Sequence, residues 1–165
     1  MERGERAIRQ LARAALPALF AVVLFTGCRS DIIFSDNISM EGERWSRYNV
    51  PLFKADITDT LNAADMAITL RSGSAYPYRN IFLFVTTVAP GGESITDTLE
   101  YRLSDDHGNR LGRGFGDIRY LELPYRTNIY FPTGGTYTFR IEHAMRREEI
   151  EGIYDVGVKI RRQQR

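Results

Sequence analysis

Apolar and polar residues alternate along most of the chain after Trp45, and this period of two is the pattern of strands with one buried face. Four segments show it clearly, with polar, charged or small residues between the apolar ones: 66–71, 98–103, 137–142 and 156–161. Turn-forming residues separate the segments, as in Pro90-Gly91-Gly92 and in the polar run 105–109. Short strands spaced in this way predict seven to nine strands in about 115 residues, arranged as a single antiparallel β-sandwich, Ig-like or jelly-roll-like.

Two segments depart from the alternation. Residues 81–85, Ile-Phe-Leu-Phe-Val, are apolar on both faces. This pattern predicts a central strand that is covered on both sides. Residues 144–150 are the one place where we expect a helical turn.

The first 28 residues have the organisation of a bacterial lipoprotein signal. Four arginines lie between Arg3 and Arg13, an apolar run covers residues 14–25, and Gly27 precedes Cys28, the only cysteine. The run of about a dozen residues is shorter than the ~20 that a membrane-spanning helix needs. We therefore expect residues 1–27 to be removed, and Cys28 to be lipidated and to attach the chain to a membrane.

The domain boundaries follow from this interpretation. Residues 28–44 are predicted to be a lipidated tether, interrupted by a short strand at residues 32–34, and residues 45–165 are predicted to form the sandwich. The mature 138 residues suffice for one domain with a core. With Cys28 acylated, no free thiol or intramolecular disulfide is left, so core packing alone must hold the fold.

Loss of the leader changes the charge balance. The full chain has a formal charge of +1, but the leader contains four Arg and two Glu, which leaves 18 basic and 19 acidic residues. Nucleic-acid-binding domains are strongly basic, so the composition argues against a nucleic-acid partner. The basic tail 159–165 fits the solvated end of a last strand, or alternatively a contact with anionic lipid or an acidic partner.

Candidate catalytic chemistry is sparse. The two histidines, His107 and His143, are 36 positions apart, without a second His or Cys at ligand spacing, and each fits a surface or capping residue. Asp105, Asp106 and Asn109 fit a turn better than a calcium loop. A site needs a nucleophile with a base, or a metal cluster. We therefore predict no enzyme, no metal and no cofactor.

Tyrosines are the remaining candidate binding residues. Five of them fall near predicted strand ends or in connections: Tyr76, Tyr78, Tyr120, Tyr125 and Tyr130. Such side chains either stack on sugar rings or form an interface, or they cover the ends of the sandwich with the hydroxyl in water.

Several ordered motifs resemble those of the GldH family, the gliding-motility lipoproteins of Bacteroidetes. The motifs are residues 76–85, 97–101, 112–118, 135–139, 144–146 and 152–157. The resemblance covers nearly the whole mature chain, from about Cys28 to Ile160. It implies an envelope lipoprotein without known enzymatic activity, needed for surface gliding and associated with machinery linked to type IX secretion. It carries over no catalytic or ligand residues.

A lipid-tethered sandwich without catalytic residues acts by presenting a surface. We expect Tyr76, Tyr78, Arg79, Asn80 and Asp117 to gather at one end and to form a partner-binding edge for other gliding or secretion envelope proteins. The alternative for this edge is that Arg79 and Asp117 form a structural pair while the nearby glycines make a bulge. The alternative for the function is a glycan- or peptidoglycan-binding module. The expected location is the outer membrane, with the domain facing the periplasm.

Overall fold

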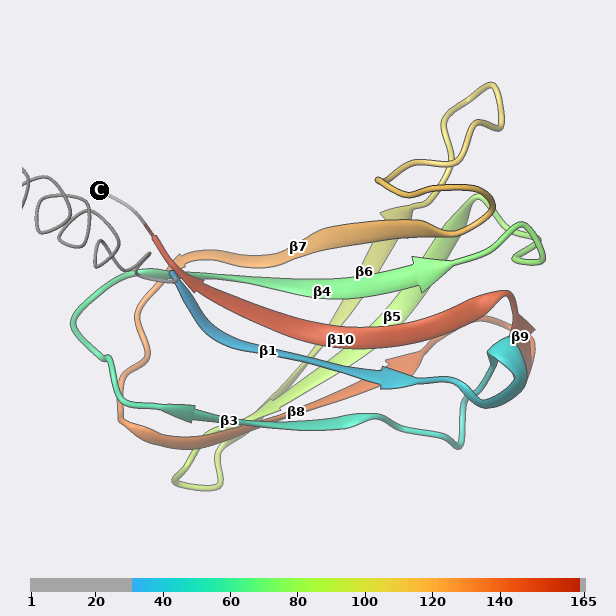
Figure 1. The fold of residues 1–165 in the computed structure, drawn as a ribbon. Coiled ribbons are helices and arrows are strands. Elements are labelled where there is room, and N and C mark those ends of the chain that lie inside the picture. Colours follow the sequence, from blue (N-terminus) through green and yellow to red (C-terminus); the bar gives the residue numbers. More distant parts are fainter. Residues whose placement is uncertain (1–30, 164–165) are drawn as a thin grey trace, which may run out of the picture. The chain divides into compact units, whose positions relative to one another are not determined.

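The computed structural model describes residues 31–163, and this part of the chain is built from antiparallel strands (Figure 1). One four-stranded sheet has the order β1-β10-β4-β7 and the other has the order β3-β8-β5-β6. The strands of the first sheet are β1 (Ile32–Ser39), β10 (Ile153–Arg162), β4 (Ala64–Ser72) and β7 (Arg119–Ile129). Those of the second are β3 (Leu52–Ile57), β8 (Gly135–His143), β5 (Asn80–Val88) and β6 (Ser94–Arg102).

Smaller elements complete the domain. β2 (Arg44–Ser46) pairs with β9 (Glu149–Glu151), and a 3-10 helix, η1 (Glu41–Glu43), precedes β2. No helix among the described residues is long and apolar enough to cross a membrane. The predicted all-β, antiparallel sandwich is confirmed.

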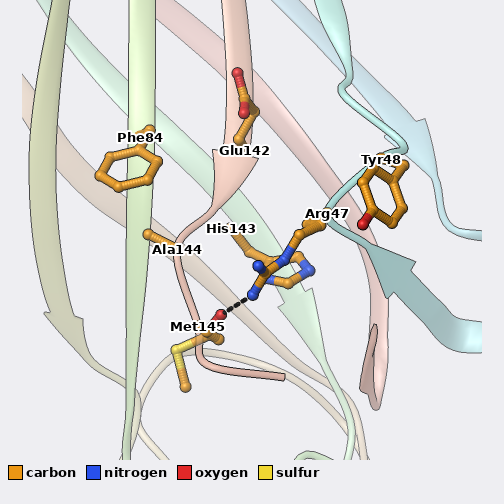
Figure 2. A pocket seen from close by; sticks show the side chains of 7 residues that line it. All are labelled: Arg47, Tyr48, Phe84, Glu142, His143, Ala144 and Met145. Atoms are coloured by element: carbon orange, nitrogen blue, oxygen red, sulfur yellow. Dashed lines mark hydrogen bonds between the residues drawn. The ribbon is translucent and has the colours of Figure 1, made fainter. Parts of the chain in front are cut away.

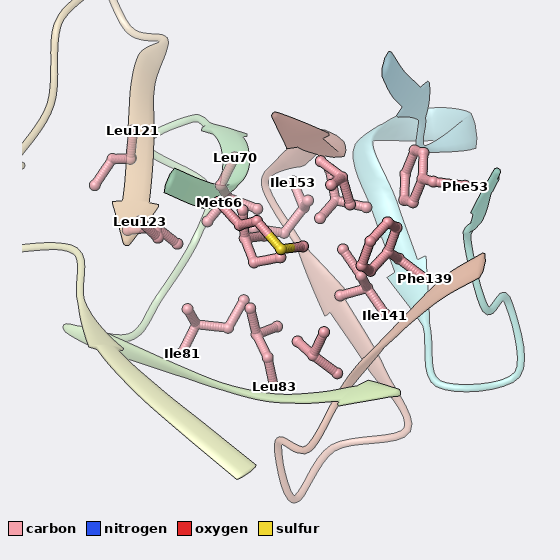
Figure 3. Packing of buried hydrophobic residues seen from close by; sticks show 14 of the residues in the cluster. Phe53, Met66, Leu70, Ile81, Leu83, Leu121, Leu123, Phe139, Ile141 and Ile153 are labelled. Carbon is pink, nitrogen blue, oxygen red and sulfur yellow. The ribbon is translucent and has the colours of Figure 1, made fainter. Parts of the chain in front are cut away.

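The alternating apolar residues of both sheets face one another and form the core. Figure 3 shows Ile81 and Leu83 of β5 opposite Met66 and Leu70 of β4, with Phe139 beside them. All five side chains are buried.

Alternation along β4, β8 and β10 turns intervening polar residues such as Arg71, Arg140 and Arg161 to the solvent, as the sequence pattern predicts. Thr69 of β4 and Asp155 of β10 are exceptions, because both are buried.

β5 is an inner strand of its sheet, between β8 and β6, but it is covered on one face only. Ile81, Leu83 and Val85 point into the core and are inaccessible to solvent. Phe82 is half-buried, and 40% of Phe84 is exposed on the other face. The prediction of a strand covered on both sides is therefore wrong, because no further layer of residues 31–163 packs on this face.

The segment assigned to the tether belongs largely to the sandwich. β1 pairs with β10 from Ile32 to Ser39, which makes it an edge strand of the first sheet. The Thr69 hydroxyl of β4 donates a 2.6 Å hydrogen bond to the side-chain oxygen of Asn37 in β1. The ordered domain thus includes residues 32–44, and the predicted boundary at residue 45 is corrected to lie at or before Ile32.

Residues 144–148 form an irregular connection rather than the predicted helical turn, and lead into β9. The turn at residues 105–109 is confirmed: the Asp105 carboxylate accepts hydrogen bonds from the backbone N–H groups of His107 and Asn109. The asparagine side chain also donates to this carboxylate.

The basic residues at the end of β10 are held by internal ion pairs. Arg161 pairs with Glu122 of β7, and Lys159 lies 2.9 Å from the same carboxylate. Arg162 pairs with Asp59 at 3.0 Å. This arrangement agrees with the interpretation of these residues as the end of a last strand.

Candidate functional site

The predicted partner-binding edge is only partly accessible. Tyr76 is buried, and its hydroxyl donates a 2.8 Å hydrogen bond to the Asn80 carbonyl. Burial raises the pKa of the Tyr76 hydroxyl above its usual range. The Asn80 side chain donates to Glu100 at 2.6 Å. Tyr78 is half-buried and meets the Tyr76 ring edge-on at 5.6 Å between centroids, so Tyr76 and Asn80 serve the fold.

Arg79 and Asp117 do not pair with each other. Asp117 accepts a 3.0 Å hydrogen bond from the Ser74 N–H and lies 3.3 Å from the Arg110 guanidinium. The Ser74 hydrogen bonds are the largest cause of the lowered pKa of Asp117. Arg79 is exposed, and its carbonyl accepts hydrogen bonds from the residues at 103 and 104.

The connection in which the alternative reading places a glycine bulge is a hairpin turn. The backbones of Arg113 and Tyr120 exchange hydrogen bonds of 2.9 and 2.7 Å across it. The bond between Ser74 and Asp117 brings this connection and the β4–β5 loop together at one end of the sandwich.

A groove opens beside Tyr78. It has a volume of about 750 Å³ and is lined by Tyr78, Phe82, Ala144, Met145, Arg146 and Arg147. The backbone N–H of Ala144 donates to the Phe82 carbonyl at 2.7 Å, which fixes the 144–148 connection against β5. We call this feature the arginine groove.

A smaller hollow of about 280 Å³ adjoins the arginine groove and shares Ala144 and Met145 with it (Figure 2). Its other lining residues come from β5, β8 and the loop after β2: Phe84, Glu142, His143, Arg47 and Tyr48.

Arg47 shapes the wall between the two hollows. Its guanidinium donates to the carbonyl of Met145 at 2.7 Å and to those of Arg146 and Arg147 at 3.2 Å each. Its own N–H donates to the Glu148 carbonyl at 2.9 Å. One cation thus satisfies three successive carbonyl groups and holds an irregular segment in a single conformation.

His143 lies beneath this wall. Only 2% of the residue is exposed, and neither ring nitrogen has a hydrogen-bond partner among the described residues. The ring meets Trp45 edge-on at 5.3 Å. Burial, and to a smaller degree the nearby Arg47 charge, lower the pKa of His143, so the imidazole is neutral at pH 7. The prediction of a surface or capping histidine is wrong.

The groove can bind an anionic group beside an apolar one. Within residues 31–163, the guanidinium groups of Arg146 and Arg147 form no ion pair or hydrogen bond, and both residues are exposed. Among the described residues, Glu142 is the single acid lining either hollow. Arginine beside an aromatic floor suits carboxylates carried on an apolar or aromatic chain.

Catalytic geometry is not seen in the described part of the chain. No group of three His, Cys, Asp or Glu side chains there could hold a metal ion. His143 contacts an arginine and a tryptophan rather than a nucleophile.

Sequence reasoning found Tyr78 but missed the other five groove residues: Phe82, Ala144, Met145, Arg146 and Arg147. Two signals pointed to them. The strand 81–85 carries phenylalanines on its second face as well, and two adjacent arginines follow the apolar pair Ala144-Met145 directly. Cys28, the predicted lipidation site, lies outside the described residues.

Comparisons with known proteins agree on one family. The profile of the family described as GldH lipoprotein matches residues 32–160. The gliding motility lipoprotein GldH homolog of Christiangramia forsetii is 34% identical over 149 residues, which cover 86% of this chain and 91% of that protein. The gliding motility lipoprotein GldH of Flavobacterium johnsoniae is 32% identical over the same length, covering 86% and 92%.

A solved structure of infectious bursal disease virus, Gx strain, covers 79% of this chain and 30% of the viral chain. Its TM-score is 0.30 at 8% identity, which is too low to support an argument about fold or function. The family profile and the two relatives span almost all of the described domain. The chain therefore belongs to the GldH lipoprotein family.

Proposed function

We propose that this protein is a non-enzymatic interaction subunit of the envelope machinery for gliding and type IX secretion. It is anchored by lipid on Cys28 and binds an acidic, apolar segment of another envelope protein in the arginine groove. The observation that carries the proposal is the pair of exposed arginines, unpaired within residues 31–163, above an aromatic and methionine floor. Buried aromatic anchors beside arginines are typical of the residues that dominate protein interfaces.

The rigidity of the groove supports this role. The Arg47 bonds to three carbonyls fix the 144–148 connection, and the hydrogen bond between Ala144 and Phe82 fixes its start. A site that is already ordered loses less conformational entropy when it binds a partner. The groove therefore binds a partner at a smaller entropic cost than a mobile loop would.

We place the domain at the outer membrane, facing the periplasm. A lipid-anchored envelope protein is what the family name implies for this chain. The outer membrane and the periplasmic side are both part of the proposal. In this location the groove faces the periplasm, where other envelope proteins can reach it.

The test is crosslinking in intact cells with a C-terminally tagged chain. The variant Arg146→Ala/Arg147→Ala removes both groove cations, and Arg113→Ala is the matched control because its guanidinium is exposed and lies outside the groove. We expect other gliding or secretion components to be captured by the parent chain and the control, and lost from the double variant. Cys28→Ala should reduce capture in all backgrounds, because the chain leaves the membrane.

Two results would overturn the proposal. Equal capture of partners by the double variant would show that the groove is not the interface. Recovery of peptidoglycan fragments without protein partners would support the alternative, a glycan-binding module. A rise in melting temperature with muropeptides would point the same way, because a bound ligand stabilises by mass action. Tyrosine positions do not favour that alternative: Tyr78 lines the groove, whereas Tyr125 and Tyr130 line a different hollow.

A further inference from the structure

The chain enters and leaves the domain at one end of the sandwich (Figure 1). The N–H of Arg162 donates to the carbonyl of Asp31 at 2.7 Å, and that of Gln163 to the carbonyl of Ala63 at 2.8 Å. Arg162 also pairs with Asp59. The start of β1, the end of β10 and the 58–63 loop are therefore joined into one surface, which we call the entry end.

Large apolar side chains are exposed at this entry end. Leu61, in the loop between β3 and β4, is 82% exposed, and Tyr130, in the loop between β7 and β8, is 55% exposed. Ile32 opens β1 with 45% of its surface accessible. A nearby hollow of about 230 Å³ is lined by Ile129, Tyr130 and Phe131 among others. Turn positions usually carry polar residues, so the exposed Leu61 and Tyr130 indicate a surface that contacts a partner.

The short link between Cys28 and the domain indicates that this partner is the membrane. Cys28 precedes Asp31 by three residues, and an extended chain spans at most ~3.6 Å per residue, about 11 Å in all. The headgroup region on each side of a bilayer is roughly 5–8 Å thick. With acyl chains on Cys28, even a fully extended link lets Asp31 rise only about 3–6 Å beyond the headgroups, so the entry end stays next to them. A tether of residues 28–44, as the sequence predicts, would have allowed the domain to stand well clear of the headgroups.

We propose that the entry end rests in the bilayer interface, with Leu61 and Tyr130 inserted among the lipid headgroups. The proposal rests on the lipid attachment proposed above. Leucine gains by leaving water, and tyrosine suits a boundary with one wet and one apolar side. Electrostatic attraction plays a small part, because Arg161 and Arg162 are already paired with Glu122 and Asp59. Binding should thus depend little on anionic lipid.

The test uses single cysteines in the full, lipidated protein. Acylated Cys28 has no thiol, so Leu61→Cys or Tyr130→Cys is the one labelling site in each variant. Phe115→Cys is the matched control, because Phe115 is 98% exposed in the loop before β7 at the other end of the sandwich. The probe is an environment-sensitive fluorophore, read in phosphatidylethanolamine vesicles with and without phosphatidylglycerol. Lipids with a nitroxide at the headgroup act as quenchers.

We expect blue-shifted, strongly quenched emission at positions 61 and 130 in both vesicle types, and water-like, unquenched emission at position 115. Water-like emission at 61 and 130, in protein that floats with vesicles, would overturn this proposal while leaving the anchor intact. Mass spectrometry of Cys28 and flotation test the anchor separately. A chain without acylation that stays in solution would overturn the anchor, and this proposal with it.

Discussion

At Gly152, between β9 and β10, the backbone passes against the loop that precedes β5. Its φ is +75°, and a Cβ atom would lie 2.2 Å from the Tyr76 nitrogen and 2.7 Å from the Ala75 carbonyl carbon. Both are backbone atoms, so neither can rotate away. We expect Gly152→Ala to lower the free energy of unfolding by about 2–3 kcal/mol, measured by urea unfolding with the fluorescence of buried Trp45.

Gly42 supplies the control for this substitution. Its φ is +60°, but nothing lies within 4 Å of the position that a methyl group would take there. Gly42→Ala should therefore cost only the backbone strain, about 1 kcal/mol. Equal losses for the two variants would show that the close approach at Gly152 contributes nothing.

His143 makes stability depend on pH. Its pKa in the folded state is below the ordinary histidine value of 6.5, chiefly because burial penalises the charged form. Between the folded and unfolded pKa values the unfolded chain binds a proton that the folded chain does not, so stability falls as pH decreases below about 6.5. We expect a slope of up to ~1.4 kcal/mol per pH unit.

The change His143→Phe keeps a ring against Trp45 and should remove this slope, whereas His107→Ala should not, because His107 is exposed. The measurement is urea unfolding at several pH values between 7 and 5. An unchanged slope in the phenylalanine variant would assign the pH dependence to other groups.

The burial of His143 could not be predicted from its position near the end of an alternating segment. Its cover comes from Trp45 and Arg47, almost 100 residues earlier, through the pairing of β2 with β9. A strand of three residues is too short to show a periodic pattern, so the sequence does not indicate which strand it pairs with. The same reason explains why Arg146 was seen as part of a motif but not as part of a groove.

Among the elements, the edge strand β1 packs closely against Gly157 of its neighbour β10. A Cβ at Gly157 in β10 would lie 2.2 Å from the Asn37 side-chain oxygen and 2.3 Å from the Asp36 carbonyl oxygen. We expect Gly157→Ala to detach β1, and hydrogen exchange of amides 32–39 to become at least tenfold faster. Amides between β4 and β7 should keep their protection, since that pairing lies on the other side of β4. Uniformly faster exchange across both sheets would contradict this expectation.

The sequence predicted elements well where one face is buried, as in β4, β8 and β10, because burial imposes the period of two. β1 was underestimated because it is an edge strand, and the polar run Ser35-Asp36-Asn37 in its middle is exposed. The 144–148 connection resembled a helical turn, but its carbonyls are satisfied by the distant Arg47 instead of by a helix. The local sequence pattern indicates which residues are buried. It does not indicate which distant residue supplies the hydrogen bonds that an irregular segment needs.

At the scale of the whole molecule, the two surfaces lie toward opposite ends of the sandwich. The entry end holds the start of β1 and the end of β10, whereas the arginine groove lies where β5 begins and β8 ends (Figure 1). β10 has ten residues, and at ~3.3 Å per residue it spans about 33 Å. A domain resting on its entry end therefore presents the groove about 30 Å from the bilayer surface.

This geometry predicts the distance from the membrane to a label at Glu148→Cys, next to the groove, measured by energy transfer to acceptors in the bilayer. In the lipidated parent we expect a narrow distribution near 30 Å, because a three-residue link limits separation and the entry-end side chains fix orientation. A flexible linker of about 20 Gly and Ser residues before Asp31 has an end-to-end distance of roughly 25 Å. When this linker is combined with Leu61→Ser and Tyr130→Ser, the distribution of distances from the label to the membrane should broaden by roughly the same 25 Å.

The linker alone is the matched control, because Leu61 and Tyr130 can still seat the domain on the lipid surface. We expect its distribution to stay narrow, and the combined variant to lose capture of partners several-fold despite an intact groove. A broad distribution in the parent chain would mean that the short link does not orient the domain. The height of the groove above the bilayer would then have no part in how this lipoprotein meets its partner.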